Sequence, residues 1–301
     1  MQIAVAATPE VAIPTLELLL QSSHDLVCVI TQPDRPSGRG LALKETPVAL
    51  WAKENGVKVY KPANQTELVS IAEKVDLVVT IGYGVIIKEE ILNLPKYGFI
   101  NLHFSLLPKW RGAAPVQRAI EAGDLVSGVT VFALDEGMDT GPIYTQHRFA
   151  LDGDITSDEL FIELAELGAE ALLHSLDLID SGVKPLPQQD HSATRALKLS
   201  KEEGRIDWSH SADVISNKVR AFTSQPGAWT NFRGSVLKID TPIVSEMRLE
   251  PGVLLIENKK LYVGTGTTAL EISYITPSGK TRMPSSEWAN GARLIAGDLF
   301  G

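Results

Sequence analysis

The sequence predicts an α/β domain with a mostly parallel sheet, followed by a small β-barrel or sandwich. In the first half of the 301-residue chain, short β-rich runs alternate with segments whose apolar residues recur at helical spacing. That alternation is typical of parallel strands joined by helices. From residue 206 onward, short β-rich runs are separated by closely spaced turn residues. We therefore expect a first domain over 1–184, a polar, proline-containing linker over 185–205 and the barrel over 206–301.

The first domain opens with a strand, a leucine-rich helix and a second strand, and further helices and strands alternate after them. A hairpin around a glycine-rich loop and a long helix complete it, with Gly182 just beyond the helix end. The predicted strands are 1–9, 25–34, 57–62, 75–84, 98–105 and the hairpin 126–151; the predicted helices are 11–23, 43–56, 64–74, 87–95 and 156–182.

The second domain is expected to begin with one helix and to continue as strands. The stretch 211–222 has helical spacing. Short strands with turn residues between them are predicted over 228–234, 235–244, 252–266 and 269–279.

Composition indicates an ordinary globular protein, since 44% of the residues are hydrophobic and 22% are charged. Its apolar runs are far shorter than the roughly 18 residues that a membrane span needs, and the start MQIAVAATPE lacks the basic residues of a signal peptide. We therefore expect a cytoplasmic protein with no membrane partner. The single cysteine, Cys28, excludes an internal disulfide, and the scattered histidines share no ligand spacing, so we expect no metal.

The formal net charge of −9 opposes indiscriminate binding to nucleic acid, because phosphates would repel the chain at long range. A polyanion would have to meet a local basic patch. The basic residues of the predicted barrel form either such a phosphate-binding face or a merely solvated surface; they include Arg233, Lys238, Lys259, Lys260, Lys280 and Arg282.

The strand 98–105 carries the first candidate site residues. Side chains two apart in a strand share a face, so Asn101 and His103 point the same way, opposite to Leu102. Polar side chains inside a buried parallel strand cost on the order of 1–3 kcal/mol each unless they are satisfied. The loop SLLPKWRGAAP that follows marks this as a carboxyl end of a strand, where ligands of open α/β sheets bind.

A Gly-rich loop supplies a possible third member of the site, because ALDEGMDTGPI holds Asp135, Glu136 and Asp139. A carboxylate near an imidazole orients it and raises its pKa, so that His103 can take a proton near neutral pH. Asn101 offers an N–H group to an oxygen that becomes negative. Without a nucleophile elbow, the set suits direct acyl transfer to an amine. The alternative is that Asn101 caps a turn and His103 is a satisfied core imidazole.

Several longer stretches resemble one known family. NLHFSLLPKWRGAAPVQRAI and GVTVFALDEGMDTGPI resemble the methionyl-tRNA formyltransferases, a branch of the folate-dependent formyltransferases. ATPEVA, TQPDRPSGRG, KLSKEEGRIDWS and VRAFTSQPGAW occur in the order found in that family, so the resemblance covers nearly the whole chain. The fold it implies is α/β, with a Rossmann-like, mostly parallel sheet domain followed by a small C-terminal β-barrel (OB-like) domain.

The resemblance implies that formyl passes from 10-formyltetrahydrofolate to the α-amine of initiator methionyl-tRNA, without an obligatory protein partner. It implies that Asn101, His103 and Asp139 are catalytic. The folate would lie against Ser105, Leu106, Leu107 and Pro108, with its pterin near the Asp139 loop. The GYG stretch, 82–84, either helps to line that pocket or is a plain strand-to-helix turn.

The loop TQPDRPSGRG carries Arg35 and Arg39, and its prolines and glycines predict irregular structure. By itself it is typical of a solvated loop. The resemblance implies instead that it wedges into the acceptor end of tRNA and tests whether the first base pair is weak, with Arg39 as the reading residue. Arginine suits this task because its planar fork contacts phosphates and base edges together.

Two other functions stay open at this point. One is a folate-dependent formyltransferase that acts on a nucleotide-linked amino sugar, which would need a sugar-nucleotide pocket in place of a tRNA surface. The other is an RNA-binding module whose α/β domain is a degenerate scaffold, and the presence of Asn101, His103 and Asp139 argues against it.

Overall fold

The structure is a computed structural model that describes residues 1–37 and 42–301. The chain forms two compact units, each assembled from more than one stretch of sequence. Unit 1 comprises Met1–Gly112, Val126–Ala150 and Phe161–Arg195, and unit 2 comprises Ala113–Leu125, Leu151–Leu160 and Ala196–Gly301. The domain boundaries expected above, 1–184, 185–205 and 206–301, stay a prediction. Among the residues described, no helix is long and apolar enough to cross a membrane.

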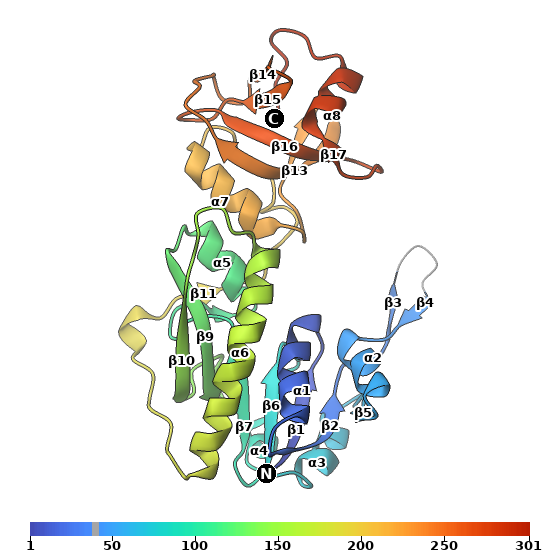
Figure 1. Cartoon of the computed structure of the whole chain (residues 1–301), viewed down its shortest axis with the longest axis vertical. Coiled ribbons are helices and arrows are strands. Elements are labelled where there is room, and N and C mark those ends of the chain that lie inside the picture. Colours follow the sequence, from blue (N-terminus) through green and yellow to red (C-terminus); the bar gives the residue numbers. More distant parts are fainter. Residues whose placement is uncertain (38–41) are drawn as a thin grey trace. The chain divides into compact units, whose positions relative to one another are not determined.

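Unit 1 is built on a seven-stranded sheet in the order β10-β9-β7-β6-β1-β2-β5 (Figure 1). Strands β7, β6, β1, β2 and β5 run parallel to one another, and β9 pairs antiparallel with both β7 and β10. The predicted mostly parallel sheet is thus confirmed. The strands are β1 (Gln2–Ala7), β2 (Asp25–Ile30), β5 (Lys58–Tyr60), β6 (Leu77–Ile81), β7 (Phe99–His103), β9 (Val126–Ala133) and β10 (Ile143–Ala150).

Helices connect these strands, and two of them begin where the sequence offers a capping side chain. Thr46 accepts from the Ala49 backbone at the start of α2, and Asn64 accepts from that of Glu67 at the start of α3. The helices and 3-10 turns of this part of the chain are η1 (Glu10–Ala12), α1 (Ile13–Leu20), α2 (Pro47–Glu54), α3 (Gln65–Ala72), α4 (Glu89–Leu92), α6 (Ser157–Asp180) and η2 (Asp190–Ser192).

Strand β6 is buried along its whole length, as a central parallel strand should be. Helix α6 packs on the neighbouring strand β7, since a Cβ added at Gly168 would lie 2.9 Å from a methyl carbon of Leu102. Side chains alternate along a strand, so Asn101 and His103 point to the face of β7 away from that contact.

The TQPDRPSGRG loop corrects one expectation. It contains the strand β3 (Arg35–Ser37), which forms a two-stranded ladder with β4 (Ala42–Lys44) just beyond the loop, and in this ladder Pro36 pairs with Leu43. A proline is tolerated in such a ladder because an edge strand needs only part of its N–H groups for pairing.

Unit 2 contains an antiparallel half-barrel of six strands in the order β12-β13-β16-β15-β14, with β17 paired to β16. Its strands are β12 (Trp229–Phe232), β13 (Ser235–Val244), β14 (Leu254–Glu257), β15 (Lys260–Val263), β16 (Leu270–Pro277) and β17 (Met283–Pro284). The helices are α5 (Pro115–Glu121), α7 (Ala212–Phe222) and α8 (Ser285–Ala292). A separate short pair consists of β8 (Arg111–Gly112), which belongs to unit 1, and β11 (Arg195–Ala196), which lies at the boundary between the stretches of sequence that belong to unit 1 and unit 2.

Candidate active site

Asn101 and His103 lie at the carboxyl end of β7, the strand where the sheet changes from parallel to antiparallel pairing. Asn101 is in register with Thr80 of β6 and with Phe132 of β9, and His103 is opposite Thr130. Since β7 ends at His103, both polar residues occupy the rim that the sequence predicts.

The imidazole of His103 is buried, with 6% of the residue exposed. Its Nε2 atom lies 3.0 Å from the carbonyl oxygen of Trp110, and its Nδ1 atom lies 3.8 Å from Oδ2 of Asp139. A carbonyl oxygen only accepts, so the neutral ring carries its hydrogen on Nε2, an assignment that rests on this partner. The Nδ1 lone pair therefore faces the carboxylate, and a proton arriving at Nδ1 would lie between the two groups.

The pKa of His103 is lowered from its ordinary value of 6.5, chiefly because burial penalises the charged ring. The Asp139 carboxylate and the Trp110 carbonyl raise the pKa in the opposite direction. As expected, the Asp139 carboxylate raises the pKa of His103, but burial lowers this pKa by more, so the net shift is downward. The ring is a neutral proton acceptor at pH 7.

Asp139 lies in the loop between β9 and β10, and its side chain is 17% exposed. Its Oδ2 atom accepts a hydrogen bond of 2.7 Å from the backbone N–H of Gly112. Its backbone adopts φ +55°, the left-handed region that aspartate tolerates better than most residues. The carboxylate is thus held by one strong donor and directed toward His103.

Asn101 is held by its neighbour on β6. Its Nδ2 group donates to Oγ1 of Thr80 at 2.8 Å, and the Thr80 hydroxyl donates to the carbonyl oxygen of Ile100. The hydroxyl hydrogen is therefore committed, which fixes Thr80 as the acceptor. A primary amide carries two N–H groups, so Thr80 engages only one of them.

The loop from Ser105 to Pro108, expected to contact the folate, is fixed by internal hydrogen bonds. The buried Ser105 hydroxyl donates to the carbonyl oxygen of Lys109 at 2.7 Å, and its own carbonyl accepts from Thr130. The backbone N–H of Leu107 donates to the same Thr130 hydroxyl. Since the Ser105 side chain is engaged and fully buried, any ligand contact of this loop falls to its backbone or to its half-buried Leu106 and Pro108.

Sequence reasoning missed the residues that fasten these loops. Gln188, from the predicted linker 185–205, donates to the carbonyl oxygens of Asp139 and Gly141 at 2.9 and 2.7 Å. Thr194, from the same stretch, accepts from the backbone N–H of Trp110 at 2.9 Å. Neither residue belongs to a periodic pattern, so the only available signal was a polar side chain in an irregular segment.

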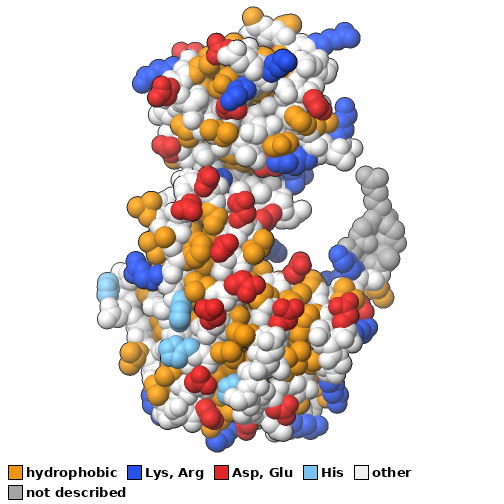
Figure 2. All heavy atoms as spheres, in the orientation of Figure 1, with side chains coloured by type: hydrophobic (Ala, Val, Ile, Leu, Met, Phe, Trp, Pro, Cys, Tyr) orange, Lys and Arg blue, Asp and Glu red, His pale blue; other side chains and the backbone are white. Residues whose placement is uncertain are grey.

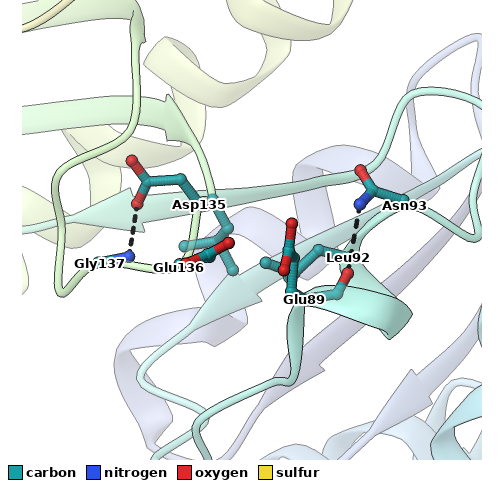
Figure 3. A pocket seen from close by; sticks show the side chains of 7 residues that line it. Glu89, Leu92, Asn93, Asp135, Glu136 and Gly137 are labelled. Carbon is teal, nitrogen blue, oxygen red and sulfur yellow. Dashed lines mark hydrogen bonds between the residues drawn. The ribbon is translucent and has the colours of Figure 1, made fainter.

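A hollow of about 400 Å³ lies beside the Asp139 loop, between α4 and residues 134–137 (Figure 3). Its lining residues are Glu89, Leu92, Asn93, Leu134, Asp135, Glu136 and Gly137. In Figure 3 the carboxyl groups of Glu89 and Glu136 lie toward each other, and the hydrogen bond between them raises the pKa of Glu89. Asp135 accepts from the N–H of Gly137, which shapes the loop. The GYG stretch is not part of this lining.

Of the two expected tRNA-reading arginines, the structure describes Arg35, whereas Arg39 lies outside the described residues. The Arg35 guanidinium donates to Oε1 of Gln32 at 2.6 Å, and the Gln32 amide donates to the Tyr83 carbonyl at 2.8 Å. The root of the β3–β4 ladder is thereby tied to the end of β6.

The basic residues of unit 2 are partly engaged by acidic partners. Arg233 pairs with Asp298, Lys260 pairs with Glu271 and Arg282 pairs with Asp240. In Figure 2 the Lys and Arg side chains on the visible face of this unit are interspersed with Asp and Glu. No group of three or more His, Cys, Asp or Glu side chains is placed to hold a metal ion within the described part of the chain.

Two family models match the chain. The model described as Formyl transferase matches residues 1–176, and the model described as Formyl transferase, C-terminal domain, matches residues 198–293. A relative named Methionyl-tRNA formyltransferase, from Salinispora tropica, is 40% identical over 309 residues, which cover 100% of both chains.

Two solved structures share the fold at lower identity. HypX from Aquifex aeolicus, in complex with tetrahydrofolic acid, is 20% identical with a TM-score of 0.68, over 96% of this chain and 46% of that one. WlaRD, a sugar 3N-formyl transferase, is 22% identical with a TM-score of 0.68, over 93% of this chain and 99% of that one. At these identities the likeness extends to the fold alone.

Proposed function

The chain belongs to the formyl transferase family, and within it to the methionyl-tRNA formyltransferases, and we propose that Asn101, His103 and Asp139 are its catalytic residues. It is an enzyme that transfers a formyl group, and its family uses tetrahydrofolate derivatives. The donor we propose is 10-formyltetrahydrofolate, and the acceptor is the α-amine of methionine on initiator tRNA. Such a substrate would be met in the cytoplasm, where we propose that the enzyme works without an obligatory protein partner.

The transfer is direct, and Asn101 polarises the formyl group. As the amine attacks the formyl carbon, the formyl oxygen becomes negative, and the N–H group of Asn101 that Thr80 does not engage donates to it. A donor of this kind is worth about 2.7–4 kcal/mol of barrier. Thr80 contributes by holding the amide plane, so that little reorganisation is needed in the transition state.

His103 takes the proton that the attacking amine must lose. The same proton then passes to the folate nitrogen as its bond to the formyl carbon breaks, and tetrahydrofolate leaves. The lowered pKa of His103 keeps the ring neutral, and Nδ1 is the atom that faces Asp139 at 3.8 Å. When Nδ1 receives the proton, the resulting imidazolium donates to the Asp139 carboxylate on one side and to the Trp110 carbonyl on the other. This convergence of an imidazole, a carboxylate and a carboxamide at one rim of the sheet is the observation that supports the proposal most strongly.

The hollow beside the Asp139 loop fits the pterin end of the folate. Its leucines offer apolar contacts for a flat ring, and Asp135, Glu136 and Glu89 offer acceptors for the ring's amino and N–H groups. The proposed contacts at Ser105, Leu106, Leu107 and Pro108 would then guide the rest of the folate toward His103.

The tRNA would be read by the loop that carries Arg35 and Arg39. Lys61 anchors this loop at both ends, since its ammonium donates to Asp34 at 2.6 Å and to Glu45 at 2.7 Å. Two fixed ends, with two arginines in the sequence between them, suit a loop that must enter the end of a nucleic acid.

A substrate assay tests the proposal. The purified protein is given 10-formyltetrahydrofolate together with either charged initiator tRNA or a nucleotide-linked amino sugar, and release of tetrahydrofolate is followed. We expect formylation of the tRNA. Formylation of the amino sugar alone would favour the second candidate, a sugar formyltransferase, while formylation of neither would contradict both.

A further inference from the structure

The side-chain amide of Gln188, which is not one of the three proposed catalytic residues, connects its own segment with two others near Asp139. The Nε2 group of Gln188 donates to the carbonyl oxygens of Asp139 and Gly141, at 2.9 and 2.7 Å. Its Oε1 atom accepts from Nε and an NH2 group of Arg111, at 3.2 and 2.7 Å. Both hydrogens of the amide and both lone pairs of its oxygen are therefore engaged.

The backbone that Gln188 contacts is one that needs outside support. Asp139 lies at φ +55°, and a Cβ at Gly141 would lie 1.8 Å from the carbonyl oxygen of Ala133, so the chain turns sharply there. A non-glycine residue in the left-handed region persists only where its surroundings hold it. Gln188 provides this support, because the two N–H groups of its planar amide donate to the carbonyl oxygens of Asp139 and Gly141.

Two connections consequently join the Asp139 loop to the segment that follows β7. Gly112 donates directly to the Asp139 carboxylate, and the neighbouring Arg111 reaches the Asp139 carbonyl through Gln188. The same segment carries the Trp110 carbonyl that holds Nε2 of His103. The amide thus couples the positions of the two groups between which the proposed proton transfer occurs.

The segment that carries Gln188 has an anchor of its own. The backbones of Leu186 and Ile143 exchange hydrogen bonds of 2.7 and 2.8 Å, which extend the edge of β10. Loss of the Gln188 side chain would therefore leave its own segment in place and remove the two hydrogen bonds that it donates to the Asp139 loop, while Gly112 still donates to the Asp139 carboxylate.

We propose that Gln188 is a positioning residue, which sets the geometry of the Asp139 carboxylate relative to Nδ1 of His103. This inference rests on the proposed function, because it assumes that Asp139 acts on His103 during catalysis. A displacement of about 1 Å in a catalytic group can cost about a hundredfold in rate. We therefore expect an effect on kcat, and a smaller one on substrate binding.

The test compares Gln188→Met and Gln188→Glu with Gln189→Met, whose side chain is exposed on the same segment. Methionine keeps the length of the side chain and loses all four hydrogen bonds. Glutamate keeps an acceptor for Arg111 and loses both donors to the carbonyls. We expect kcat to fall about tenfold to a hundredfold in both Gln188 variants, with KM for the folate changed by less than about threefold. Gln189→Met should match the unchanged enzyme.

A double-mutant cycle with Asp139→Asn separates positioning from a general structural role. If Gln188 acts through Asp139, Gln188→Met should cost less than about threefold in the Asp139→Asn background. In the otherwise unchanged enzyme, Gln188→Met should also move the acid limb of the kcat profile to lower pH, as a displaced carboxylate no longer raises the pKa of His103. The inference is overturned if Gln188→Met lowers kcat by the same factor in both backgrounds. It is also overturned if Gln188→Glu keeps a near-normal kcat, or if the acid limb of Gln188→Met stays at the same pH. Full activity of Asp139→Asn alone would instead contradict the proposed function.

Discussion

Nδ1 of His103 lies 3.8 Å from Oδ2 of Asp139, and the carboxylate reaches this position from the loop that joins β9 to β10. Within this pair, burial lowers the pKa of the imidazole and the carboxylate raises it. The balance between the two influences makes the pair sensitive to any change in either member.

Replacing Asp139 with Asn should lower kcat by about a hundredfold and move its acid limb to lower pH. The carboxylate that raises the pKa of His103 is lost, while the burial that lowers it remains. The pH profile of kcat measures both effects, and His174→Asn, at an exposed position, is the control. If the acid limb of Asp139→Asn lies at the same pH as that of the unchanged enzyme, the carboxylate does not influence the group that titrates.

The same lowered pKa predicts how His103 affects stability. Because the folded-state pKa lies below 6.5, the unfolded chain binds a proton more readily, and the stability contributed by the neutral ring is lost as pH falls through and below 6.5. His103→Gln should therefore weaken the dependence of the melting temperature on pH in this window. An identical dependence in both proteins would argue that the buried ring does not titrate there.

Asn101→Asp should lower kcat by about a hundredfold or more while leaving the fold intact. The aspartate has almost the same shape, but an ionised carboxylate cannot donate to the formyl oxygen and repels its developing charge. Steady-state rates, with circular dichroism as a check on folding, test this expectation. Asn290→Asp, at an exposed position on α8 and outside the lining of the hollow, offers a matched comparison. A rate close to that of the unchanged enzyme would remove Asn101 from the site.

Narrowing the hollow beside the Asp139 loop should weaken folate binding selectively. Leu134 lines it and is partly exposed, so Leu134→Trp places a larger ring in the space proposed for the pterin. We expect KM for the folate to rise by about tenfold and KM for the tRNA to stay the same. Leu20→Trp, at a partly exposed position on α1, controls for an added tryptophan. A rise in both KM values would speak against a pterin site here.

Arg35→Ala and Arg39→Ala should each raise KM for the tRNA by about tenfold without affecting KM for the folate. Each change removes a cation that can meet phosphates or base edges, so the dependence of tRNA binding on salt should also become shallower. Binding measured across a salt series checks this. Lys74→Ala, an exposed cation of unit 1 elsewhere, should leave the slope unchanged. Equal salt slopes in all variants would place the tRNA on another surface.

Glu45, which follows strand β4, should make the stability of the protein depend on pH in acid. Hydrogen bonds from Lys53 and Lys61 lower the pKa of Glu45 to about 2 from an ordinary value of 4.5. Its contribution to stability is therefore present above pH 4.5 and is lost as pH falls toward 2. Glu45→Gln should lower the melting temperature at neutral pH and converge with the unchanged protein in acid, whereas Glu54→Gln should do neither. A constant difference at every pH would contradict the role of the charge.

A large part of the fold was predictable from local patterns. Alternating β-rich and helical segments predicted the mostly parallel sheet, and the pattern of residues 98–105 predicted that Asn101 and His103 lie at the carboxyl end of a strand. These predictions succeed because the period of a strand or helix, and the cost of burying an unsatisfied polar group, are properties of a few adjacent residues.

Other parts of the site needed the tertiary structure. The sequence alone determined which residue types stand at the end of β7 and in the loop that holds Asp139. Only the folded chain decided that burial outweighs the carboxylate at His103, and that Gln188, from a stretch resembling a linker, reaches Arg111 and Asp139. The physical reason is that burial and loop-to-loop hydrogen bonds arise between segments far apart in the sequence, and irregular segments leave no periodic trace of their partners.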